Sequence, residues 1–164
     1  MADIKLPKLK TTKEPEPIPF PANDKKKTIL LLSDDCRMTS GVGVMSLEII
    51  RQTCHKYNWI QLAGAINHPD KGKRLDLSED TNKQTGIEDA SVIIYPQDGY
   101  GNPDVLRAVI ENDKPDAIFL ITDPRYFIWL FQMENEIRRK IPIAYLNIWD
   151  DYPAPAYNKE YYQS

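Results

Sequence analysis

The sequence lacks the features that mark membrane, disulfide-rich and zinc-binding proteins. Cys36 and Cys54 are its only cysteines, and they do not form a Cys-x-x-Cys pair, so neither a disulfide framework nor a zinc site is expected. Apolar runs such as "ILLL" and "AIFLI" are far shorter than the roughly 20 residues of a membrane helix. Residues 1–27 lack the apolar centre of a signal peptide. We therefore expect a cytoplasmic protein without an integral membrane segment.

Several common site motifs are also missing. Gly41 and Gly43 form Gly-x-Gly, but Ser46 stands where the dinucleotide fingerprint requires a third glycine. No Gly-Lys-Ser/Thr follows to make a phosphate-binding P-loop, and no Gly-x-Ser-x-Gly elbow supports a serine hydrolase. His55 and His68 have no suitably spaced partner, so we expect no metal site.

Charge and proline divide the chain into a tail and a body. Residues 1–27 hold five prolines and seven lysines against four acidic residues. Such a segment buries too little apolar surface to offset its ordering entropy, so we expect a disordered, basic tail. Residues 28–164 are acidic overall, which argues against nucleic acid as a partner.

The body alternates short apolar segments with helical patterns. The predicted strands cover 28–33, 59–66, 91–96, 116–122 and 141–148. Three helices are predicted. The first has an apolar stripe at Leu47, Ile50, Cys54 and Tyr57. The second begins at the cap and proline Asn102-Pro103, and the third begins at Asp123-Pro124 and continues with an apolar stripe at Tyr126, Leu130, Met133 and Ile137. Residues 67–88 read as a polar surface excursion. This alternation predicts an α/β, Rossmann-like three-layer α/β/α domain with a mostly parallel sheet.

Ligands of such sheets bind beyond the carboxyl ends of the strands, where this chain places polar residues. The first candidate is Ser40, Gly41, Val42 and Gly43, between the first strand and the first helix. Helix-initial N–H groups can bind a phosphate, and glycine lets it approach the backbone. The alternative is a tight turn in which Ser40 caps the helix.

Asp34 and Asp35 end the first strand and resemble the acidic pocket of receiver domains, with Asp98 as phosphoacceptor and Thr122 as the hydroxyl residue. No lysine follows the fifth strand, where receivers have one. We therefore favour the interpretation that Asp34 and Asp35 are solvated loop residues at the rim of a cleft.

Two further loops carry groups suited to carbohydrate. Asp98 and Tyr100 lie in "YPQDGYGNPD", and Trp149 and Asp151 lie in "NIWDDYPAPAYNKEYY". Carboxylates bind hydroxyl groups, and an aromatic face stacks on a sugar ring. Asp123 adds a carboxylate after the fourth strand. The alternative in each case is an ordinary turn or a proline-broken loop.

Over about residues 27–164 the chain resembles the N-terminal domain of GT-B fold glycosyltransferases of the family 4 type. The similarity rests on three segments in order, namely "TILLLSDDCRMTSGVGVMSLEII", "KPDAIFLIT" and "IPIAYLNIWDDYP". The resemblance implies an acceptor-side domain that works with a C-terminal donor domain, which this chain does not contain. That domain would be supplied in cis or in trans, and this chain alone would be inactive.

The resemblance also implies a nucleotide-sugar co-substrate, an acceptor of unknown identity and no metal ion. Gly41, Val42 and Gly43 would donate backbone N–H groups to the donor diphosphate. Many relatives have His where this chain has Trp149, so Asp150 becomes the catalytic candidate. We further expect Gly43→Val to leave the domain folded but to abolish donor use in the complete enzyme. The alternatives are a non-catalytic nucleotide- or sugar-binding module and a receiver-type regulatory domain.

Overall fold

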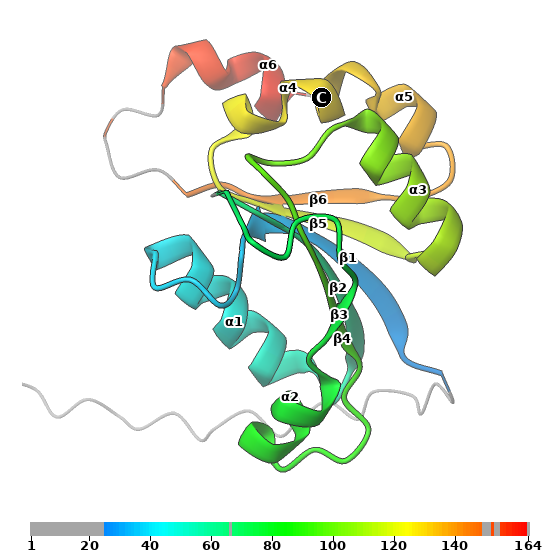
Figure 1. Ribbon diagram of the computed structural model, residues 1–164. Coiled ribbons are helices and arrows are strands. Elements are labelled where there is room, and N and C mark those ends of the chain that lie inside the picture. Colours follow the sequence, from blue (N-terminus) through cyan, green and yellow to red (C-terminus); the bar gives the residue numbers. More distant parts are fainter. Residues whose placement is uncertain (1–24, 66, 149–151, 153–154, 164) are drawn as a thin grey trace, which may run out of the picture.

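A six-stranded sheet forms the centre of the protein (Figure 1). The computed structural model describes residues 25–65, 67–148, 152 and 155–163. The strands are β1 (Lys27–Asp34), β2 (Tyr57–Gly64), β3 (Leu75–Asp76), β4 (Val92–Pro96), β5 (Ala117–Ile121) and β6 (Ile143–Leu146). They lie in the order β3-β4-β2-β1-β5-β6. The short β3 pairs antiparallel with β4, and the other pairs are parallel.

The order of the parallel strands is that of a Rossmann-like sheet. Numbered along the chain, the five parallel strands lie in the order 3-2-1-4-5. The chain thus builds outward from β1 in one direction and then in the other, which places the switch point between β1 and β5. Receiver-type sheets have the order 2-1-3-4-5. The receiver alternative is therefore wrong for this chain.

Helices cover both faces and complete the predicted three layers (Figure 1). On one face lie α1 (Gly41–Thr53) and α2 (Ser78–Thr85), and on the other lie α3 (Pro103–Asp113), α4 (Ile128–Gln132) and α5 (Glu134–Ile137). Two 3-10 helices, η1 (Pro124–Phe127) and η2 (Ala156–Asn158), and α6 (Lys159–Tyr162) complete the set. No helix in the described residues is long and apolar enough to cross a membrane.

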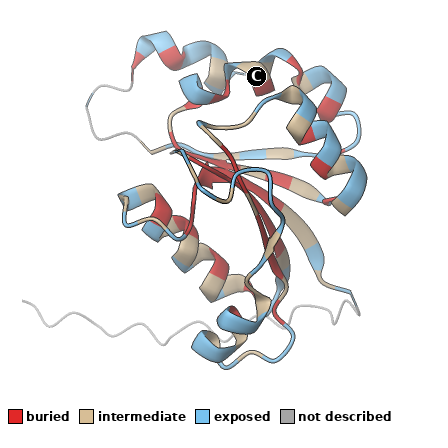
Figure 2. Ribbon diagram, viewed as in Figure 1, coloured by how far each residue is buried: buried red, intermediate tan, exposed pale blue. Residues whose placement is uncertain are grey.

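The two faces of β1 enter two separate apolar clusters. Leu30 and Leu32 pack with α3, α4 and α5, whereas Leu31 packs on the side of α1. All three leucines are fully buried, and the buried residues in Figure 2 follow the central strands. A parallel strand covered on both faces needs apolar residues at every position, which explains the unbroken run "ILLL".

The helix predicted from Leu47 to Tyr57 is too long. Leu47 and Ile50 do face the apolar cluster, but α1 ends at Thr53 and Cys54 is its C-cap. Tyr57 is the first residue of β2, so its place in the stripe is wrong. Its spacing from Cys54 matches a helical period by coincidence, because a periodicity does not show where the chain turns.

The polar excursion predicted over 67–88 is also wrong in part, since it contains β3 and α2. The residues of α2 are polar, and Thr81 is its one buried residue, so no apolar stripe reveals the helix. The single helix predicted after Asp123 is divided into η1, α4 and α5.

At the N-terminus, the predicted disordered tail falls mainly on residues 1–24, which lie outside the described residues. Its last three residues are placed, which corrects the predicted boundary. Lys27 begins β1, and the ammonium of Lys26 donates to the carbonyl oxygen of Cys54 at 3.0 Å.

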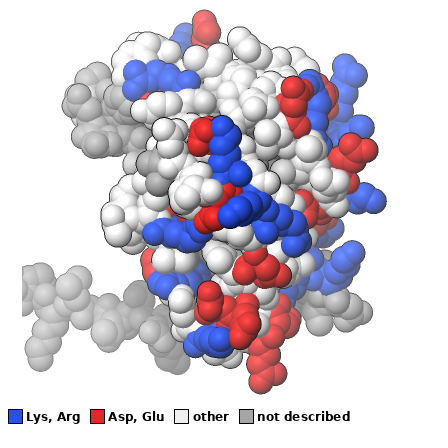
Figure 3. All heavy atoms as spheres, viewed as in Figure 1, with Lys and Arg blue, Asp and Glu red and all other residues white. Residues whose placement is uncertain are grey.

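Charges of both signs are intermixed on the face shown in Figure 3. Across the middle of that face, Lys and Arg side chains adjoin one another, with Asp and Glu side chains beside them. The expectation that nucleic acid is not a partner stays a prediction.

The predicted start of α3 is confirmed and gives a stability test. The side chain of Asn102 accepts from the backbone N–H groups of Asp104 and Val105 at 3.0 and 3.1 Å. Asn102→Ala removes this cap and should lower the free energy of unfolding by about 1 kcal/mol in urea titrations. Asn112→Ala, the same change at an exposed position in this helix, is the control and should cost nothing measurable. Equal losses in both variants would contradict the capping role.

Candidate functional site

Buried polar residues gather where the strands end, at the edge of the sheet that contains the switch point. They are Ser33, Asp34, Asp35, Gln61, Gln97 and Thr122. Buried polar groups are costly unless they are hydrogen-bonded, so each needs a partner. For Ser33, Asp34, Asp35 and Gln61, these partners connect β1 and β2 with the loops around the N-terminus of α1.

Ser40 caps α1 and fastens it to β1. Its hydroxyl accepts from the backbone N–H of Gly43 at 3.0 Å and donates to the Asp34 carboxylate at 2.8 Å. The predicted capping role is thus present. Gly41 begins the helix, and neither its N–H nor that of Val42 has an acceptor among the described residues.

The two glycines of this loop play different roles. A Cβ on Gly43 would lie 2.8 and 2.9 Å from the carbonyl oxygens of Asp35 and Met38, whereas a Cβ on Gly41 would meet nothing within 4 Å. Gly43 is buried and Gly41 is exposed. Gly43 therefore serves close packing of α1 against its own loop, and this crowding argues against the expectation that Gly43→Val leaves the domain folded, which stays a prediction.

Asp34 is at the centre of the hydrogen bonds. Its side chain accepts from Tyr100 Oη at 2.9 Å as well as from Ser40, and the residue is only 7% exposed. Asp35 is 1% exposed and accepts from the guanidinium of Arg37 through both carboxylate oxygens. Arg37 also contacts His68 Nε2 at 2.8 Å. The placement of both aspartates at a solvated rim is therefore wrong.

Gln61 supports this arrangement from inside β2. It is fully buried, and its amide donates to Ser33 Oγ at 2.7 Å and to the carbonyl of Asp34 at 2.8 Å. Its amide oxygen accepts from the backbone N–H of Cys36 at 3.1 Å. The sequence interpretation missed Gln61. The available signal was one amide side chain inside the apolar strand "WIQLAGAI".

Tyr100 joins the loop after β4 to the switch point. Its ring stacks on Tyr126, with centroids 4.6 Å apart and planes 16° apart, and meets Phe127 edge-on at 5.3 Å. Burial and the hydrogen bond to Asp34 raise the pKa of Tyr100, so its hydroxyl keeps its proton and donates this hydrogen bond at neutral pH.

Two other predicted residues lie in ion pairs. Asp98 pairs with Lys71, and this contact lowers the pKa of its carboxyl group. Asp123 caps η1 and pairs with Arg125, which likewise lowers the pKa of Asp123. Neither is hydrogen-bonded to Asp34 in the described structure. Trp149, Asp150 and Asp151 lie outside the described residues, so the catalytic candidate is not placed.

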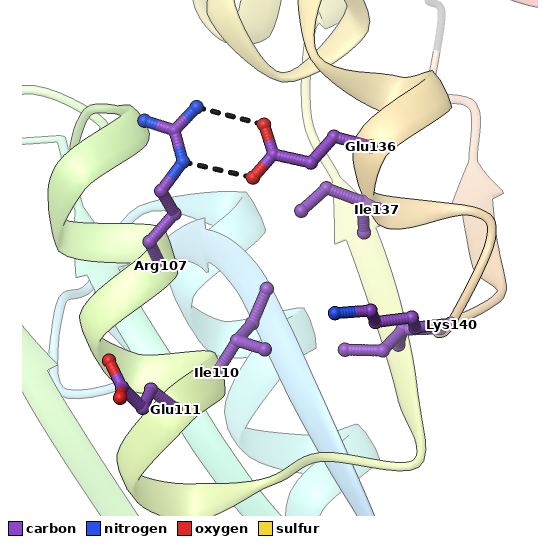
Figure 4. A pocket seen from close by; sticks show the side chains of 7 residues that line it. Arg107, Ile110, Glu111, Glu136, Ile137 and Lys140 are labelled. Carbon is purple, nitrogen blue, oxygen red and sulfur yellow. Dashed lines mark hydrogen bonds and ion pairs between the residues drawn. The ribbon is translucent and has the colours of Figure 1, made fainter.

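A surface hollow of about 350 Å³ lies away from these strand ends, between α3 and α5 (Figure 4). Arg107 and Glu136 pair across it, above Ile110 and Ile137. No predicted site residue lines it. We place the candidate site at the strand ends instead, because the buried polar groups and the switch point meet there.

The described residues contain no group of three His, Cys, Asp or Glu side chains able to hold a metal ion. Burial raises the pKa of the Cys36 thiol to about 12, which removes it as a nucleophile. Searches against protein-family models, curated proteins and solved structures give no match to this chain. Its function therefore has to be argued from its own residues.

The two glycines provide a matched pair of variants. Gly43→Ala forces a methyl group against two backbone carbonyls and should lower the free energy of unfolding by about 1–3 kcal/mol. Gly41→Ala should leave stability unchanged or raise it slightly, because alanine favours helix more than glycine does. Urea unfolding measures both. Equal stability of the two variants would show that Gly43 is not closely packed.

The Tyr100–Asp34 hydrogen bond is open to a similar comparison. Tyr100→Phe leaves a buried carboxylate oxygen without its donor and should destabilise the fold by about 2 kcal/mol. Tyr95→Phe, which removes a 2.7 Å bond to the less buried Asp113, should cost less than about 1 kcal/mol. A smaller loss in Tyr100→Phe than in Tyr95→Phe would contradict the central role of Asp34.

Proposed function

We propose that this chain is the acceptor-side domain of a glycosyltransferase that uses a nucleotide-sugar donor. The observation that carries the proposal is the arrangement at the switch point. There, an exposed Gly41 opens a 13-residue helix whose cap is fastened to a buried carboxylate. Ligands of Rossmann-like sheets bind at this place.

The chemistry of the α1 N-terminus suits the leaving diphosphate. Sugar transfer leaves negative charge on the departing nucleoside diphosphate, and fixed N–H groups stabilise such charge without reorganising. Gly41 and Val42 are the donors available for it. The N–H of Gly43 is already bonded to Ser40 at 3.0 Å, so we do not assign it to the ligand.

The remaining parts of the proposal follow from the resemblance described above. A donor-binding domain, in cis or in trans, would hold the nucleotide, and an acceptor would enter from the side of this domain. No metal ion takes part. A non-catalytic nucleotide- or sugar-binding module is the second candidate, and the geometry of the α1 N-terminus suits it equally.

One substitution removes the backbone N–H of Gly41 but keeps the backbone conformation of the helix start. Gly41→Pro removes that N–H but suits the first helical position, and Ser40 already has the extended backbone (φ −67°, ψ 154°) required before proline. With the complete gene product, or this chain plus the chain that supplies the donor domain, Gly41→Pro should lower kcat/KM for sugar transfer about tenfold. Gly41→Ala, which keeps the N–H, should retain activity.

Mass-spectrometric detection of the glycosylated product over a panel of nucleotide sugars and acceptors measures this effect. Full activity of Gly41→Pro would contradict the proposed contact between the Gly41 N–H and the diphosphate. Micromolar binding of nucleoside diphosphates by this chain alone, without transfer in any combination, would favour the non-catalytic module.

A further inference from the structure

Tyr126 presents an exposed aromatic ring directly beside the candidate site. It is 55% exposed, although the adjacent Phe127 and the nearby Pro124 are buried. Its backbone N–H donates to the carbonyl of Asp123 at 3.2 Å within the turn of η1. Tyr126 is therefore fixed in position without being part of the core.

The ring behind Tyr126 is immobilised. Tyr100 stacks on it nearly parallel, donates its hydroxyl to buried Asp34 at 2.9 Å, and meets buried Phe127 edge-on. Since Tyr100 covers one face of Tyr126, only the other face of the Tyr126 ring remains for a stacked ligand. The two stacked rings form a platform whose outer ring belongs to a residue that is 55% exposed.

The backbone that carries Tyr126 is strained. Thr122 has φ 111°, outside the regions open to a β-branched residue. Its carbonyl accepts from Tyr145 Oη at 3.0 Å, which helps to hold this conformation. Strain of this kind persists where the surrounding structure enforces it, and it clusters at binding sites.

Charged groups adjoin the platform. The Asp123–Arg125 pair directly precedes Tyr126 in sequence, and the guanidinium of Arg125 also lies 5.1 Å from the centroid of the Tyr157 ring. An aromatic face beside a carboxylate and a guanidinium matches a ring with a flat C–H face and hydroxyl groups at its edge. A pyranose has this chemistry.

We propose that Tyr126, backed by Tyr100, is a stacking residue for the sugar ring of a carbohydrate ligand. The platform itself follows from the geometry, and only its place on the acceptor side rests on the proposed function. Tyr126 was not among the residues that the sequence pointed to as binding residues.

Nuclear magnetic resonance titration of the ¹⁵N-labelled 164-residue chain with methyl glycosides of glucose, galactose and mannose tests this role. At least one should produce saturable shifts at Tyr100 and at residues 122–127. Tyr126→Ala should weaken that binding about tenfold, as loss of a stacked aromatic does in related recognition, and Tyr126→Phe should restore it to within about twofold.

Tyr57→Ala is the matched control, because Tyr57 is also exposed but lies at the amino end of β2, far from the strand ends of the site. It should leave glycoside binding unchanged. Absence of saturable shifts with every glycoside, or equal affinity in Tyr126→Ala, would overturn the proposal. Binding of uridine or adenosine at these residues in place of glycosides would overturn the carbohydrate assignment.

The two proposals fail separately. Glycoside binding at Tyr126 without sugar transfer by any combination of chains would support the stacking role of Tyr126 and contradict the transferase proposal. Sugar transfer that is unaffected by Tyr126→Ala would support the transferase proposal and contradict the stacking role of Tyr126.

Discussion

The buried carboxylate of Asp34 is the constraint on which the candidate site depends. It accepts from Ser40 and Tyr100, so one side chain joins the end of β1, the start of α1 and the loop after β4. The described residues provide it with no ion pair. Its charge is instead stabilised by two hydroxyl donors and by the positive end of the α1 dipole. Loss of either donor would leave a buried charge poorly compensated.

A buried polar layer thus lies behind the exposed residues that we propose as ligand contacts. The buried side chains of Gln61 in β2 and Ser33 in β1 link these two strands beneath the exposed loops. Above them, Gly41 and Tyr126 are exposed and have little to contribute to the core. This division is what a binding site requires, because ligand-facing groups are held accurately only when the residues behind them are satisfied and fixed.

Local signals in the sequence predicted the elements well where those signals were strong. The five parallel strands were recognisable as short apolar runs, although β3 was not, and Asn102 marked the start of α3 before a proline. The polar helix α2 had no such signal. In the site, Ser40 and Tyr100 were identified, Asp34 was wrongly interpreted as a solvated rim residue, and Gln61 was missed. A polar residue in a sequence looks solvated, and only its tertiary partners show that it is buried and satisfied.

By itself, the sequence determined the α/β class and the edge of the sheet where polar loops collect, because apolar periodicity and helix caps are properties of neighbouring residues. The tertiary structure alone decided the strand order, which excludes the receiver fold. It also decided that Gly43 is packed while Gly41 is open, and that Tyr100 stacks on Tyr126. These outcomes depend on contacts between segments far apart in the chain, which no local pattern records.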